Sequence, residues 1–287
     1  MINLPVLIAV ILWGLSFIAT KLALNYLSPI EIIGVRMFLA VPVLFILVKL
    51  KGLPIRFRKS DYIALIPASI ILAMHFLIQA LGLIYTTATN TAWLIATIPV
   101  FIAVLSYLFL REKLTIRKIF GIVVATFGVL LLISNGSINT LGWLKSIGDW
   151  LILSSCITWS VYTIITRNIT RRCNPLAISF SLLLFPALIL TIYVLFTAPI
   201  ERFASLPPEI IAMLVFLGVF CLGLAHWLWL EGLSRKGAVD VGIYLYFEPV
   251  VTTIAAIPIL GEKLTFFMIV GAMLIVAGVY LVERKTS

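Results

Sequence analysis

The stretch Glu112-Lys113-Leu114-Thr115 returns unchanged 150 residues later as Glu262-Lys263-Leu264-Thr265. The same offset relates further glycines and prolines of the two halves: Gly82, Pro99, Gly121 and Gly128 match Gly232, Pro249, Gly271 and Gly278. Upstream, at an offset of 146, Trp13 and Pro29 match Trp159 and Pro175. One register kept through so many identities indicates an internal duplication. The change of offset indicates a short insertion between the second and third helices of the second half.

The composition points to a membrane protein. Of the 287 residues, 63% are hydrophobic and 11% are charged, whereas a soluble domain carries roughly 25% charged residues. The apolar residues form runs of about 20, the length of a transmembrane helix. Lipid offers no partner to free backbone groups, so each span must be helical. We predict ten transmembrane helices, approximately at residues 3–24, 30–49, 61–84, 87–109, 115–134, 147–167, 175–198, 208–231, 237–260 and 265–283.

Each half holds five spans, so the second half must be inverted relative to the first. The predicted fold is therefore an all-α integral membrane protein with two inverted five-helix repeats, residues 1–135 and 147–283, around a central cavity. With the N-terminus inside, 16 of the 21 lysines and arginines lie in inner loops and the C-terminal tail. Such a bias indicates a multi-pass protein of the inner, cytoplasmic membrane with both termini cytoplasmic. It also accounts for the net charge of +10 without nucleic-acid binding.

Enzymatic chemistry is not expected. The three cysteines, Cys156, Cys173 and Cys221, form no CxxC pair, and the two histidines lie in different predicted helices. The chain also lacks the HExxH, DxxxD and GxSxG patterns of membrane enzymes. We predict no metal, no cofactor and no catalytic residue.

Polar and aromatic side chains recur on one face of several spans, as expected where helices line a water-filled path. The candidate cavity residues are Trp13, Ser16, Thr20, Arg36, His75, Gln79, Asn90, Trp93, Trp159, Tyr162, Trp229, Tyr244 and Glu248. Spans 115–134 and 265–283 nearly lack such residues and are predicted at the periphery. A purely structural role stays open for each stripe, because serine and threonine also bond to their own helix and aromatic residues also form interfacial belts.

Two titratable candidates are predicted near the membrane midplane. Glu248 lies about eleven residues, or about 16 Å, into its span. A charge there costs at least about 2.5–3.5 kcal/mol, so Glu248 either binds a solute amine or a coupled proton, or is a protonated or arginine-bonded structural acid. His75 lies at a similar depth, and its ordinary pKa of roughly 6.5 suits proton exchange. A hydrogen-bonded interior histidine is the alternative.

Arg36 lies about ten ångströms inside its span. It either snorkels or pairs with Glu31, or it clamps a solute carboxylate. Pro99 and Pro249 occupy matching positions, where they form either hinges of a rocking transporter or static kinks. Glu112 and Glu262 are both expected to cap the next helix.

The sequence also resembles a known family, the EamA-domain branch of the drug/metabolite transporter superfamily. The resemblance rests on Trp13-Gly14 with Phe17 and Lys21, on Arg36-Met37-Phe38-Leu39-Ala40, on Leu110–Thr115 with Gly121 and Gly128, and on Glu248-Pro249-Val250 with Leu260–Thr265. It implies ten helices around a cavity that opens alternately to each side, and most commonly the export of amino acids or related metabolites. In the second half Ser160 and Leu182 replace the glycine and arginine of the pattern, so the two halves are not functionally equivalent.

Within this family a nucleotide-sugar, phosphorylated-sugar or drug substrate is the alternative, and a channel or a membrane scaffold is a further one. Many candidate cavity residues are aromatic and only Arg36 is a deeply placed cation. We therefore expect amino acids or similar amphipathic zwitterions. The expected partners are this small solute, the lipid bilayer and, as a candidate coupling ion, the proton; the oligomeric state stays open.

Overall fold

A computed structural model describes residues 3–134, 146–260 and 265–283, and all regular structure in them is helical. The first half contains α1 (Leu4–Ala23), α2 (Pro29–Leu50), α3 (Lys59–Tyr85), α4 (Ala88–Ile95), α5 (Ile98–Leu105), the π-helical turn η1 (Ser106–Leu110) and α6 (Ile116–Ser134). The second half contains α7 (Ile147–Thr170), α8 (Pro175–Thr197), α9 (Ile200–Ala204), α10 (Pro208–Val215), the π-helix η3 (Phe216–Leu224), α11 (Ala225–Arg235), α12 (Ala238–Gly242), the 3-10 turn η4 (Ile243–Tyr246), α13 (Phe247–Leu260) and α14 (Phe266–Glu283).

Eight helical segments among the described residues are long and apolar enough to cross a membrane. They coincide with eight of the ten predicted spans, and α6 and α7 occupy the other two with 19 and 24 residues. Large apolar side chains cover the outer surface; Phe196 and Ile63, for example, are 86% and 78% exposed. Such a surface is unsuited to water and suits contact with lipid.

Spans 87–109 and 237–260 were each predicted as one helix with a hinge or a static kink at its proline, and in the structure both are divided. The first is interrupted between α4 and α5, and the second passes through η4 before it continues as α13. Pro99 and Pro249 lie just after these interruptions. Proline has no N–H, and its ring meets the carbonyl four residues earlier, so each of these prolines disturbs the helix in the turn that precedes it. The short helix α9 lies where the change of offset predicted an insertion.

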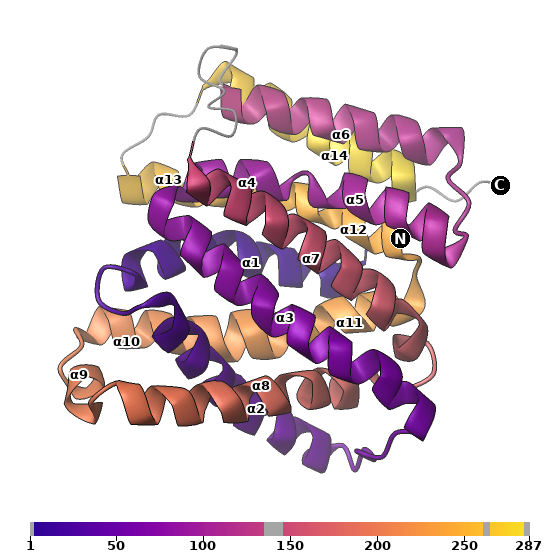
Figure 1. The fold of residues 1–287 in the computed structure, drawn as a ribbon. Coiled ribbons are helices and arrows are strands. Elements are labelled where there is room, and N and C mark those ends of the chain that lie inside the picture. Colours follow the sequence, from indigo (N-terminus) through magenta and orange to yellow (C-terminus); the bar gives the residue numbers. More distant parts are fainter. Residues whose placement is uncertain (1–2, 135–145, 261–264, 284–287) are drawn as a thin grey trace.

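The most extensive contacts between the two halves are those of α2 with α8, α3 with α7, and α6 with α14. Figure 1 shows α6 and α14 side by side at one edge of the molecule, the peripheral position predicted for them. Small residues let this pair approach closely. A Cβ atom on Gly121 would lie 2.8 Å from the carbonyl oxygen of Gly278, and one on Gly128 would lie 2.7 Å from that of Gly271.

Candidate functional site

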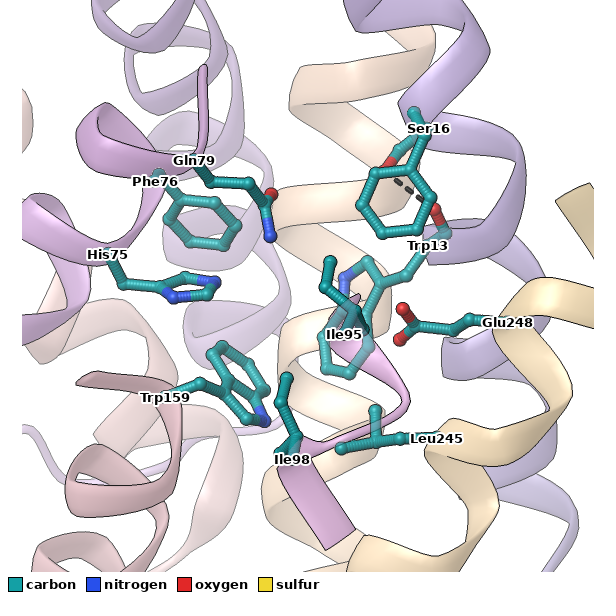
Figure 2. A pocket seen from close by; sticks show the side chains of 11 residues that line it. Trp13, Ser16, His75, Phe76, Gln79, Ile95, Ile98, Trp159, Leu245 and Glu248 are labelled. Atoms are coloured by element: carbon teal, nitrogen blue, oxygen red, sulfur yellow. Dashed lines mark hydrogen bonds between the residues drawn. The ribbon is translucent and has the colours of Figure 1, made fainter. Parts of the chain in front are cut away.

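A small cavity of about 30 Å³ lies between the two halves (Figure 2). Its walls come from α1, α3, α4, α5, α7, η4 and α13. The lining residues are Trp13, Ser16, Phe17, His75, Phe76, Gln79, Ile95, Ile98, Trp159, Leu245 and Glu248. Both helix interruptions open onto it, because Ile95 and Ile98 flank one, and Leu245 and Glu248 flank the other. Interrupted helices of this kind surround the substrate sites of many secondary transporters.

Three tryptophans from different helices form one side of the site. The ring centroids of Trp13 and Trp159 lie 5.0 Å apart, and each lies 5.5 Å from the centroid of Trp229. The indole N–H of Trp13 donates to the carbonyl oxygen of Cys221 at 2.8 Å. Contacts between aromatic edges and faces stabilise such a cluster beyond its buried area. The cluster therefore gives the cavity a rigid, largely apolar base.

Glu248 brings the only acidic side chain among the lining residues. It is 3% exposed, and within the described part of the chain its carboxylate has no hydrogen-bond or ion-pair partner. Its helix is fixed against α1, because the Thr252 hydroxyl donates to the Gly14 carbonyl at 2.8 Å. In Figure 2 the carboxylate points into the cavity toward the wall that carries His75 and Gln79.

His75 lies on that opposite wall and is 3% exposed. Its Nδ1 lies 2.9 Å from the carbonyl oxygen of Ser155. A carbonyl only accepts, so Nδ1 carries the proton, and a neutral ring leaves Nε2 as an acceptor. The hydrogen-bonded interior role foreseen for His75 is therefore present, and the same ring lines the cavity.

Of the other candidates, Tyr162 and Trp229 lie directly behind the cavity. The Tyr162 hydroxyl is 2.6 Å from Nε2 of His226, whose Nδ1 is 2.6 Å from the Ser179 hydroxyl. Both nitrogens of His226 are thus bonded, as is typical of a structural core histidine. Trp93 and Thr20 are buried in α4 and α1 without reaching the lining.

Asn90 and Tyr244 belong to contacts at opposite ends of the molecule. The Asn90 amide donates to Asp149 at 2.5 Å and so ties α4 to α7. The Tyr244 hydroxyl accepts the backbone N–H of Asn3 at 2.6 Å. Neither side chain lines the cavity.

Of the alternatives given for Arg36, the structure does not contain the pairing with Glu31. Glu31 accepts from Arg202 at 2.9 Å and from the Ser28 hydroxyl at 2.7 Å, because it completes the N-terminal cap of α2. Arg36 does not snorkel either, since it is 3% exposed. Its guanidinium lies 5.0 Å from the ring centroid of Phe76.

Five lining residues were not among the candidates, namely Phe17, Phe76, Ile95, Ile98 and Leu245. Apolar residues in an apolar span carry no signal that separates cavity walls from helix contacts. The internal repeat does give such a signal, because two of these residues, Ile98 and Ile95, correspond at the offset of 150 to Glu248 and Leu245, which also line the cavity.

The repeat also exposes an asymmetry around the site. Ser16, Phe76 and Gln79 line open space. Their counterparts in the second half, Tyr162, His226 and Trp229, are fully buried and packed together. The residues of the first half therefore line the cavity, while their counterparts in the second half are packed against one another.

An ion pair holds the helix ends beyond these packed residues. Glu112 accepts the backbone N–H groups of Ala238 and Val239 at 3.0 and 3.4 Å and lies 3.5 Å from Nε of Arg167. It thus caps α12 of the other half, whereas we expected it to cap the next helix, α6. That helix is capped by Thr115 instead. The corresponding Glu262 lies outside the described residues.

The cavity resembles the binding site of a transporter, and comparison with known proteins decides the family. The model of the EamA-like transporter family matches residues 1–134 and 146–284. The chain belongs to the EamA-like transporter family. This transporter is 29% identical over 287 residues to a protein of Archaeoglobus fulgidus named an uncharacterized transporter, with 99% of this chain and 97% of that relative covered.

A second relative is the uncharacterized transporter YyaM of Bacillus subtilis. It is 28% identical over 269 residues, which cover 93% of this transporter and 88% of YyaM. A solved structure described only as a crystal structure of a protein shares the fold, with a TM-score of 0.78 at 18% identity over 98% of this chain and 96% of that one. The family identifies this chain as a multi-pass membrane transporter and not an enzyme.

Proposed function

We propose that this transporter exports amino acids or related amphipathic solutes by alternating access. The observation that carries the proposal is the carboxylate of Glu248, which has no partner among the described residues and faces a cavity with an aromatic base. A carboxylate so placed is costly unless it is protonated, hydrated or bound to a cation. A solute amine or a coupled proton supplies that cation, and the tryptophan cluster suits the apolar body of the solute.

The proposed architecture is ten spans in two inverted units, residues 1–135 and 147–283. Two observations support it. In the α6–α14 pair, Gly121 meets Gly278 and Gly128 meets Gly271, and these four glycines are exchanged in pairs by the offset of 150. Such reciprocal contacts are typical of a two-fold axis. The cavity lies where counterparts meet, since both Trp13 and Trp159 line it.

The alternating mechanism is supported by the asymmetry of the centre. A transporter with inverted repeats exchanges two conformations as one unit rocks against the other. Here one half-site is open, and the other is filled and held shut beyond Tyr162 by the Glu112–Arg167 contact. Pro99 and Pro249 mark the interruptions at which α5 and α13 can turn.

A phosphorylated or nucleotide-linked sugar is the less supported substrate. Such a site needs several cations, and the described lining contains neither lysine nor arginine. For the placement in the membrane, the distribution of lysine and arginine supports an inner membrane with both termini cytoplasmic. Lys145 and Lys263, two of the outer residues in that topology, lie outside the described residues.

The test is transport by purified protein in lipid vesicles. Amino acids that raise the melting temperature of the purified protein are chosen first, and counterflow of the radiolabelled compound is then measured. We expect saturable counterflow that Glu248→Gln reduces and that protein-free vesicles lack. Uptake that rises linearly with solute concentration would indicate a channel, and the absence of counterflow for every stabilising amino acid would reject the proposed substrate class.

A further inference from the structure

Arg36 is a buried cation directly behind the cavity wall. It is 3% exposed, and its guanidinium lies 5.0 Å from the centre of the Phe76 ring. Within the described residues no carboxylate and no hydrogen-bond acceptor contacts this guanidinium, and its Nε is buried without a partner. A cation–π contact offsets only part of the cost of removing a guanidinium from water. The group therefore lacks an anion.

Phe76 is what separates this cation from the solute. One face of its ring meets Arg36, and the ring itself lines the cavity. The cavity beside it has a volume of about 30 Å³, room for about one water molecule, so the ring can turn aside only when the cavity widens. A turn of that kind would bring the guanidinium into contact with the solute.

We propose that Arg36 binds an anionic group of the transported solute, a carboxylate, and that Phe76 covers this subsite in the present conformation. The proposal rests on the proposed function, since Glu248 then receives the amine at the opposite wall. Gln79 lies on the same wall as Phe76 (Figure 2), where its side-chain amide N–H can also donate to a carboxylate oxygen. A guanidinium matches a carboxylate with two parallel hydrogen bonds.

The repeat makes the subsite one-sided. The residue of the second half that corresponds to Arg36 is Leu182, which is fully buried. A solute with one carboxylate can therefore be held in only one orientation. This selects a zwitterion over a dicarboxylate.

Accessibility of Arg36 is tested by arginine modification with phenylglyoxal, followed by mass spectrometry of peptides. We expect Arg36 to react slowly in the unchanged protein and about tenfold faster or more in Phe76→Leu, with acetate and N-acetyl-L-leucine protecting it. Phe38→Leu is the matched control, because Phe38 lies on α2, the helix of Arg36, and is 55% exposed on its outer side. The exposed Arg111 reports reagent activity in each sample. Equal modification in both variants, or no protection by either carboxylate, would overturn the proposal.

Binding with Phe76 intact provides the second measurement, read from tryptophan fluorescence because Trp13 and Trp159 line the site. Arg36→Gln should lower the affinity for N-acetyl-L-leucine by about tenfold or more, the usual scale for lost charge-assisted hydrogen bonds. The affinity for L-leucinamide, which has no carboxylate, should stay unchanged. Equal losses for both compounds, or none for N-acetyl-L-leucine, would overturn the role of Arg36. If Glu248→Gln leaves the affinity for L-leucinamide unchanged, the amine site of the proposed function is rejected. The Arg36 subsite is not affected by that result.

Discussion

The contact between Glu112, Arg167 and the start of α12 offers a direct test of alternating access. Glu112→Gln removes the charge and keeps the shape of the side chain. The variant retains one acceptor for the Ala238 N–H, which is now 3.0 Å from Oε1, but no longer neutralises Arg167. We expect it to release the helix ends beyond the filled half of the centre and so to favour the alternate conformation.

The size of the effect follows from the burial of the pair. The side chains of Arg167 and Glu112 are 9% and 20% exposed, so the contact is largely but not fully removed from solvent. Breaking a fully buried pair costs about 3–5 kcal/mol, and exposed pairs are worth about 0–1 kcal/mol. A value of about 2 kcal/mol lies between them and corresponds to roughly a 30-fold change in population.

The population is measured by the reactivity of Thr166→Cys in a protein free of native cysteines. Thr166 is fully buried between the cavity base and the ion pair, and its hydroxyl bonds only to its own helix. A charged maleimide should therefore react with it about 30-fold faster when Glu112→Gln is added, provided that opening is rapid. Glu231→Gln is the matched control, since it breaks an exposed ion pair within α11. Equal rates in the two variants would refute a gating role for Glu112.

Three further outcomes are expected. Glu248→Gln should flatten the pH dependence of counterflow while expression stays normal, and a profile that matches the unchanged protein would leave Glu248 a structural role only. Gly128→Leu should lower the melting temperature, because a side chain there meets the Gly271 carbonyl at 2.7 Å and overpacking costs about 1–3 kcal/mol or more; unaltered melting would argue against the α6–α14 contact. A cysteine at Lys59 should react with an impermeant maleimide only after cells are opened, and labelling of intact cells would reverse the topology.

Local chemistry explains why much of the fold could be predicted. Helices in lipid must satisfy their own backbone, so apolar length alone located the spans, and the repeated glycines and prolines related the two halves. The same glycines meet in the structure at the α6–α14 contact. A kink or a hinge was predicted at Pro99 and Pro249, but not its form, because a proline in a span produces anything from a mild bend to a break depending on its neighbours.

The site depended on contacts that no single span determines. Polar stripes predicted an interior face for six spans (3–24, 61–84, 87–109, 147–167, 208–231 and 237–260), and six of the thirteen candidate residues line the cavity. The helix that packs against a side chain decides whether that side chain lines a cavity or bonds to a neighbour. Tyr162, for example, meets His226 of α11. The partner of Glu112 lies 126 residues away at α12, not on its own helix. Sequence alone thus determined that the chain is helical and membrane-spanning, because this follows from local composition, whereas only the tertiary packing decided which polar groups are paired and which, like Glu248 and Arg36, have no hydrogen-bonding partner among the described residues.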